Sequence, residues 1–134
     1  MNTGKKGKSH IGLRVVLDTN VYISVFNFPE SPLWEIWRHA RNDTYDLVIS
    51  PAIIKEFARI CREDFGWDEK KTVRHLKLIT AYAEIVVPQT IPDVTKEDPD
   101  DNHILACALA GNANLIGSRD LDLLRLKTYG TMVS

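Results

Sequence analysis

Apolar stretches and amphipathic stretches alternate along the chain, and this alternation predicts a succession of strands and helices. Short apolar runs favour strands buried in a sheet, at residues 12–17, 45–50, 84–87 and 114–117, with the start of a fifth at 131–134. Apolar residues at helical spacing predict helices over residues 21–26, 33–40, 52–63, 70–83 and 102–110, and a last short helix over 118–126. We therefore expect an α/β fold, a three-layer α/β/α sandwich around a mostly parallel sheet of about five strands.

Capping residues indicate where several of these helices begin. Thr19 or Asn20 can cap the first helix, because both lie just before its apolar residues. Ser50 and Pro51 supply a cap and a first-turn proline for the third helix. Asp68 is placed to start the fourth helix.

Composition favours one soluble domain. The chain has 134 residues, of which 44% are hydrophobic and 26% charged, as in ordinary globular proteins. No apolar run is long enough to span a bilayer, and the basic start MNTGKKGKSH is not followed by the apolar block of a signal peptide. We expect a cytoplasmic protein that does not bind membranes. Residues 1–10 should be a flexible basic tail, and residues 11–134 a single domain.

The net charge and the cysteines exclude two simple arguments about function. A formal net charge of −1 removes overall basicity as evidence for nucleic-acid binding, so any such evidence must come from a site. Cys61 and Cys107 lie far apart without the spacing of a redox or zinc motif, among apolar residues at helical spacing. Both are predicted to be buried, reduced thiols.

Four acids are predicted to gather at one end of the sheet. Asp18 directly follows the first strand, and Glu56 lies in the first two turns of the helix after the second. Asp101 begins the helix before the fourth strand, and Asp120 comes three residues after that strand. Ligands bind beyond the C-terminal ends of parallel strands, and carboxylates that repel one another favour a hard cation such as Mg²⁺ or Mn²⁺. Such ions could activate a water and stabilise the leaving oxygen of a phosphodiester.

Each of these acids also has a purely structural interpretation. Asp18 or Asp101 could be a helix cap, Glu56 a solvated helical charge, and Asp120 a turn residue. It is the four together that favour a metal site. Neighbouring acids offer alternative ligands for the same site: Asp98, Asp100 and Asp122.

The segments that carry these acids resemble the PIN-domain family. They read LDTNVYIS, SPAIIKEF and DPDDNHILACALAGNANLIGSRDLDLL, and they are most similar to VapC-type ribonuclease toxins of bacterial toxin-antitoxin systems. The resemblance runs from Leu13 onward and implies a PIN-like nuclease domain over residues 11–134. By this resemblance Asn20 takes the polar position after the first acid, and Ser118 the hydroxyl position before the fourth.

The resemblance also implies an activity and partners. It implies an endoribonuclease that uses Mg²⁺ or Mn²⁺ to hydrolyse RNA phosphodiester bonds with a metal-activated water. Asp18 and Asp101 would be direct ligands, and Glu56 would bind directly or through water. Asp120 would complete or orient the site. An RNA substrate, an antitoxin protein and a homodimer follow from the same resemblance.

Other functions fit the sequence less well. A phosphoacceptor receiver-like Mg²⁺-binding domain needs paired acids after its first strand, whereas Asp18 stands alone. A haloacid-dehalogenase-like phosphatase needs an aspartate where this chain has Asn20. A catalytically silent PIN-fold interaction module remains an alternative, although loss of catalysis usually removes acids and this chain keeps four.

The basic residues near the acids have no assigned role at this point. On a helix, His103 points roughly 200° away from Asp101, which favours packing or a surface hydrogen bond over a role as general base. Arginines such as Arg59 and Arg62 could contact phosphate, but charged residues on helix faces are usually only solvated.

Overall fold

The computed structural model describes the backbone of residues 12–89, 99–118 and 123–125, and the side chains of residues 12–89 and 102–118. The predicted tail at residues 1–10 and the predicted strand at residues 131–134 lie outside the described residues.

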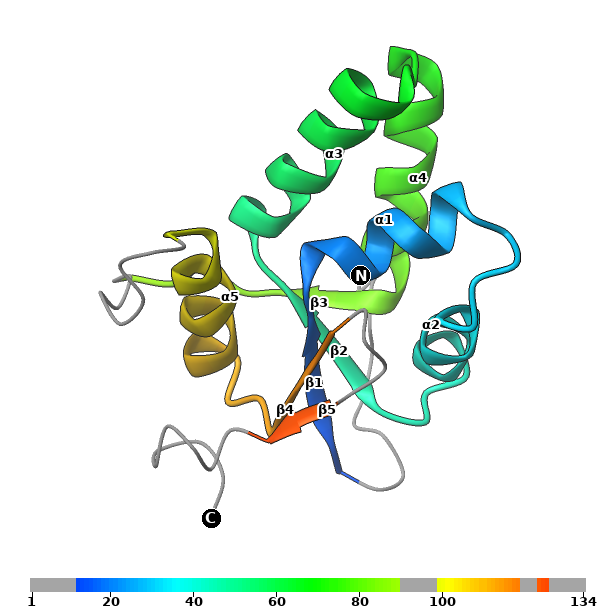
Figure 1. Ribbon diagram of the computed structural model, residues 1–134. Coiled ribbons are helices and arrows are strands. Elements are labelled where there is room, and N and C mark those ends of the chain that lie inside the picture. Colours follow the sequence, from blue (N-terminus) through cyan, green and yellow to red (C-terminus); the bar gives the residue numbers. More distant parts are fainter. Residues whose placement is uncertain (1–11, 90–98, 119–122, 126–134) are drawn as a thin grey trace.

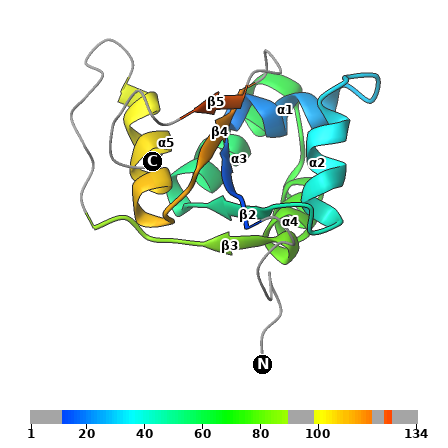
Figure 2. The same ribbon diagram turned by 90° about the horizontal axis from the view of Figure 1, so that it is seen from below.

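Five strands of the described chain form one sheet, which Figures 1 and 2 show from two sides. Across the sheet they are β3 (Ala83–Ile85), β2 (Asp46–Ile49), β1 (Arg14–Leu17), β4 (Leu115–Gly117) and β5 (Leu123–Arg125). The first four are parallel and β5 runs antiparallel to β4, which confirms the mostly parallel sheet. The central strands are buried on both faces, which explains why their sequences are continuous apolar runs.

Helices cover both faces of this sheet. The described residues form α1 (Thr19–Asn27), α2 (Trp34–Arg41), α3 (Pro51–Phe65), α4 (Glu69–Tyr82) and α5 (Pro99–Ala110). Helix α5 lies on one side of the sheet, with α1 and α2 on the other (Figure 2). Helices α3 and α4 form a hairpin that rises above the C-terminal edge of the parallel strands (Figure 1). The three-layer α/β/α architecture is therefore confirmed.

The start of α3 follows the predicted signals, and its end, two residues beyond the predicted 63, is set by a glycine. The Ser50 hydroxyl accepts the N–H of Ile53 at 3.4 Å, and Pro51 is the first helical residue. Gly66 ends the helix with a φ of 69°, a left-handed conformation that glycine adopts without steric cost. Asp68 caps α4, also as predicted. These signals fix how α3 leaves β2 and turns back into α4.

Two predictions were wrong. The cap of α1 is not Thr19 or Asn20 but Asp18, as the structural interpretation of that acid allowed, because the Asp18 side chain accepts the N–H of Asn20. The predicted helix over 118–126 is interrupted by a strand, since Leu123–Arg125 pairs with β4 as β5. A short apolar run fits either structure, and here pairing with the edge of the sheet decides.

Helix α5 approaches the sheet very closely at its end. A Cβ on Gly111 would lie 2.5 Å from Cγ1 of Val48, so no larger residue fits there without a shift. The Nε of Arg14 donates to the Gly111 carbonyl at 2.6 Å and holds the same point. Cys61 and Cys107 are buried free thiols, as predicted. Within the described part of the chain, no helix has the length and apolarity needed to cross a membrane.

Candidate active site

Asp18 lies where β1 passes into α1. Leu17 is paired with Gly117 of β4, and the backbone N–H of Asp18 donates to the Gly117 carbonyl at 2.9 Å. Asp18 and Ser118 are thus the next residues on two neighbouring strands. The half-buried Asp18 side chain uses Oδ1 to accept the N–H of Asn20 at 3.2 Å. Among the described residues, nothing donates to its Oδ2, which leaves one carboxylate oxygen for a ligand.

Glu56 lies in the second turn of α3 and is partly buried, with 24% of its side chain exposed. Glu56 therefore lies at the edge of the buried face of α3 and is not fully solvated. Its Oε2 accepts a hydrogen bond from Arg59 at 3.0 Å, and Arg59 also donates to Glu63 at 3.1 Å. The bond to Glu56 raises the pKa of the Arg59 guanidinium. Glu56 therefore has a cationic partner on its own helix.

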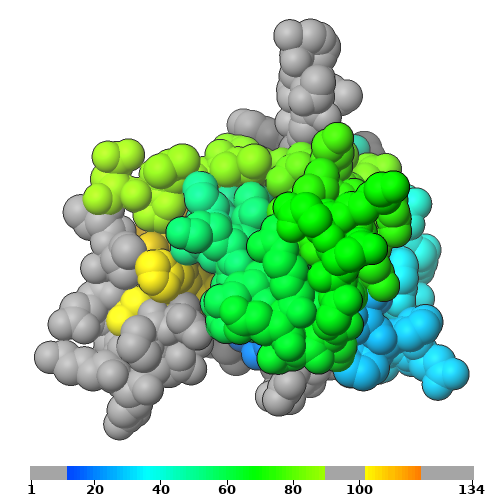
Figure 3. Space-filling model, turned by 90° about the horizontal axis from the view of Figure 1, so that it is seen from above, coloured from blue at the N-terminus to red at the C-terminus, as the bar shows by residue number. Residues whose placement is uncertain are grey.

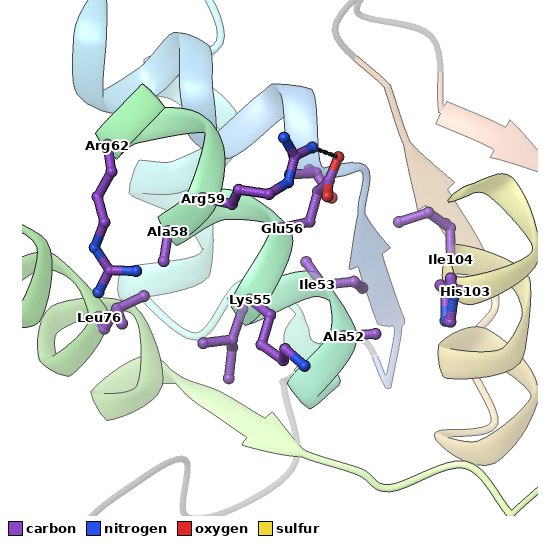
Figure 4. Close-up of a pocket in the computed structure, with 12 residues that line it drawn as sticks. Ala52, Ile53, Lys55, Glu56, Ala58, Arg59, Arg62, Leu76, His103 and Ile104 are labelled. Atoms are coloured by element: carbon purple, nitrogen blue, oxygen red, sulfur yellow. Dashed lines mark hydrogen bonds and ion pairs between the residues drawn. The ribbon is translucent and has the colours of Figure 1, made fainter. Parts of the chain in front are cut away.

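A pocket of about 570 Å³ joins the start of α1 to α3 and α5 (Figure 4). Glu56 lines it from α3, Thr19 from the residue after Asp18, and His103 from α5. Figure 3 looks down on this edge of the sheet, where the start of α3 and α5 lie side by side. The structure thus brings Glu56 and the start of α1, which Asp18 caps, to one pocket.

The remaining predicted acids are described only in part or not at all. Asp100 and Asp101 lie in the first turn of α5, and only their backbone is described. Three more candidates lie outside the described residues: Asp98, Asp120 and Asp122. Within the side chains that are described, no group of three His, Cys, Asp or Glu residues could hold a metal ion. A site with four carboxylates therefore stays a prediction.

Sequence reasoning missed the cationic wall of this pocket. Lys55, Arg59 and Arg62 all line it, as does the half-buried ring of His103. The three cations are spaced four and three residues apart, which places them along one side of α3. That spacing, read together with Glu56, is the signal that could have shown the wall. His103, expected in packing or in a surface hydrogen bond, is half-buried in the opposite wall of the pocket (Figure 4).

Comparison with known proteins agrees with this architecture. A model of the PIN-domain family matches residues 14–122, a stretch that starts at the first residue of β1 and includes every helix named above. Among curated proteins, no match to the chain was found. PIN domains are generally nucleases, hydrolases that act on nucleic acids. The chain belongs to the PIN-domain family.

Proposed function

We propose that this chain is a divalent-metal-dependent endoribonuclease whose site consists of Asp18, Glu56, Asp101 and Asp120. The observation that carries the proposal is the meeting of the start of α1 with α3 and α5 at the C-terminal edge of the sheet, with Glu56 in the shared pocket. This edge is where ligands bind in parallel α/β sheets. The family is one of nucleases, which supports hydrolysis of a phosphodiester over other uses of the same edge.

The two described carboxylates fit a hard divalent cation. Oδ2 of Asp18 and Oε1 of Glu56 are carboxylate oxygens to which no described residue donates, and oxygen is the donor that Mg²⁺ and Mn²⁺ prefer. A bound cation would supply Lewis acidity for the attack of water on phosphorus. In this proposal Asp18 and Asp101 hold the cation, Glu56 holds it directly or through water, and Asp120 completes the site.

Other side chains have supporting roles in the proposal. The N–H of Asn20 holds the Asp18 carboxylate in place, and Ser118 sits beside Asp18 at the end of β4. Three acids remain alternatives for the ligand positions: Asp98, Asp100 and Asp122. The wider proposal is the toxin of a toxin-antitoxin pair, acting in the cytoplasm as a homodimer and inhibited by an antitoxin, and it rests on the sequence resemblance.

One observation favours a second candidate, a catalytically silent interaction module. The Glu56 carboxylate is already paired with Arg59, and this ion pair balances the negative charge of Glu56 without a metal ion. Membership of the PIN-domain family, by contrast, removes the receiver-like and dehalogenase-like alternatives.

The deciding experiment incubates the protein with a mixed RNA pool in Mg²⁺, in Mn²⁺ and in chelator, and then maps the cut ends. We expect cleavage with either metal and none in chelator. Full activity in chelator would contradict the metal mechanism. Intact RNA under every condition would favour the silent module.

A further inference from the structure

The pocket that Glu56 lines has an apolar floor and a cationic rim. Its floor is built from aliphatic side chains of three helices: Ile53, Ile54, Ala58, Leu76 and Ile104. Its described rim holds three cations of α3 against a single carboxylate, that of Glu56. A surface of this kind favours a ligand that is both anionic and partly apolar.

Two of the three cations already have carboxylate partners. Arg59 is shared between Glu56 and Glu63, and Arg62 lies 2.8 Å from Glu69. Lys55 differs from them, because no ion pair joins it to any residue in the described parts of the chain. Its side chain leaves α3 on the side of the pocket (Figure 4). Lys55 can therefore bind an external anion without first breaking an ion pair to a described side chain.

We propose that this pocket binds one nucleotide of a single-stranded RNA, with the base on the apolar floor and a phosphate at Lys55. The proposal rests on the proposed ribonuclease function, since it places the substrate strand next to Glu56. A volume of about 570 Å³ suits a ligand group of that size. A pocket between helices accepts an unpaired base, which can turn away from its strand, and the His103 ring on the opposite wall offers a stacking surface.

Binding is measured without cleavage, by fluorescence anisotropy of a labelled single-stranded RNA oligonucleotide in chelator at several salt concentrations. The Lys55→Gln variant should raise the Kd roughly ten-fold, the loss expected for one charge-assisted hydrogen bond. It should also reduce the slope of log K against log salt by about 0.7, the value for one phosphate on a single strand. The matched control is Lys70→Gln, an exposed lysine of α4 outside the pocket, which should change neither quantity.

A second variant tests the position of the base. Ala52→Phe fills the pocket from the start of α3, and it should weaken RNA binding several-fold while the salt slope stays unchanged, because that slope counts phosphates. Ala81→Phe, at an exposed site on α4, is its control and should bind RNA as the parent does. Thermal melting of each variant checks that the fold is intact.

Several outcomes would overturn the proposal. If both Lys55→Gln and Ala52→Phe bind RNA with the parent's affinity, the proposal is wrong. That result would favour an apolar segment of a protein partner as the ligand of the pocket. Equal losses in Lys55→Gln and Lys70→Gln, or no measurable RNA binding by the parent, would overturn it as well. An effect at Lys55 alone would overturn the position of the base. A Lys55-dependent affinity in a protein that cuts no RNA would refute the proposed nuclease but keep the pocket assignment.

Discussion

Replacing Asp18 by asparagine or by alanine separates helix capping from metal binding at a single side chain. Capping uses Oδ1, which accepts the N–H of Asn20 at 3.2 Å, and asparagine keeps a side-chain carbonyl oxygen that can do the same. Alanine removes that acceptor, at a cost of about 1 kcal/mol in the free energy of unfolding. For a domain of this size, such a loss lowers the Tm by roughly 3–6 °C. In chelator, Asp18→Ala should therefore melt below the parent and Asp18→Asn close to it.

Metal binding should respond differently, because both variants delete the proposed carboxylate ligand. At Mn²⁺ concentrations about 100 times the Kd, the parent should gain roughly 2.7 kcal/mol of stability through linkage. Both variants should gain much less and should lose RNA cleavage. The assays are calorimetric melting in chelator and in Mn²⁺, together with cleavage of the mapped RNA substrate.

Asp68 provides the matched control, since it caps α4 in the same way by accepting the N–H of Lys71 at 2.8 Å. Asp68→Ala should lose a similar amount of stability yet keep the Mn²⁺ response and the cleavage rate. If Asp18→Asn cuts RNA at the parent's rate and keeps the full Mn²⁺ stabilisation, then Asp18 is only a cap and the proposed site is misplaced.

Three further predictions concern the scaffold and the tail. Gly111→Ala should lower the free energy of unfolding in urea by roughly 1–3 kcal/mol, because the new Cβ would overlap Val48. Gly66→Ala, the control, should lower it by only about 1 kcal/mol, because of the positive φ at that position. A Gly111→Ala variant as stable as the parent would contradict the close approach of α5 to the sheet. Burial raises the pKa of the Cys107 thiol to about 12, so the folded protein keeps a proton that the unfolded chain releases near pH 9. Stability should fall as pH rises between these values, and the fall should be shallower in Cys107→Ala, as chemical denaturation at several pH values would test. Removal of residues 1–9, rich in glycine and polar residues, should leave melting and cleavage unchanged, whereas weaker RNA binding with a shallower salt slope would assign its lysines to phosphates.

Local signals predicted those parts of the fold that depend on neighbours in sequence. The start of α3 followed from Ser50 and Pro51, and its course followed from the apolar periodicity after them. The cap of α1 did not, because Asp18, Thr19 and Asn20 are all good capping residues. The pairing of β1 with β4 decides among them: Asp18 still bonds to Gly117 across the sheet, so the helix begins after it.

The candidate site was predictable only to the extent that the sheet gathers residues that follow its strands. The end of β1 was enough to place Asp18 at this edge. Placing Glu56 also required the buried face of α3, which Ile53 and Phe57 mark. The pairing of Glu56 with Arg59 follows from their three-residue spacing. The sequence does not show that α5 lines the same pocket as this pair. The sequence could not place His103 in the pocket, because the position of α5 against the sheet depends on contacts with strands far away in the chain.

The described half of the site is held in place mainly by contacts that do not involve its carboxylate groups. The backbone of Asp18 is fixed by its bond to Gly117, α3 by the Ser50 cap, and α5 by the close approach of Gly111 to the sheet. Substituting a carboxylate should therefore leave the scaffold intact, apart from the capping bond of Asp18. A variant that keeps the parent's melting temperature in chelator and loses cleavage then reports on chemistry rather than on folding. For Glu56, whose carboxylate bonds only to an exposed arginine among the described residues, Glu56→Gln should behave in this way.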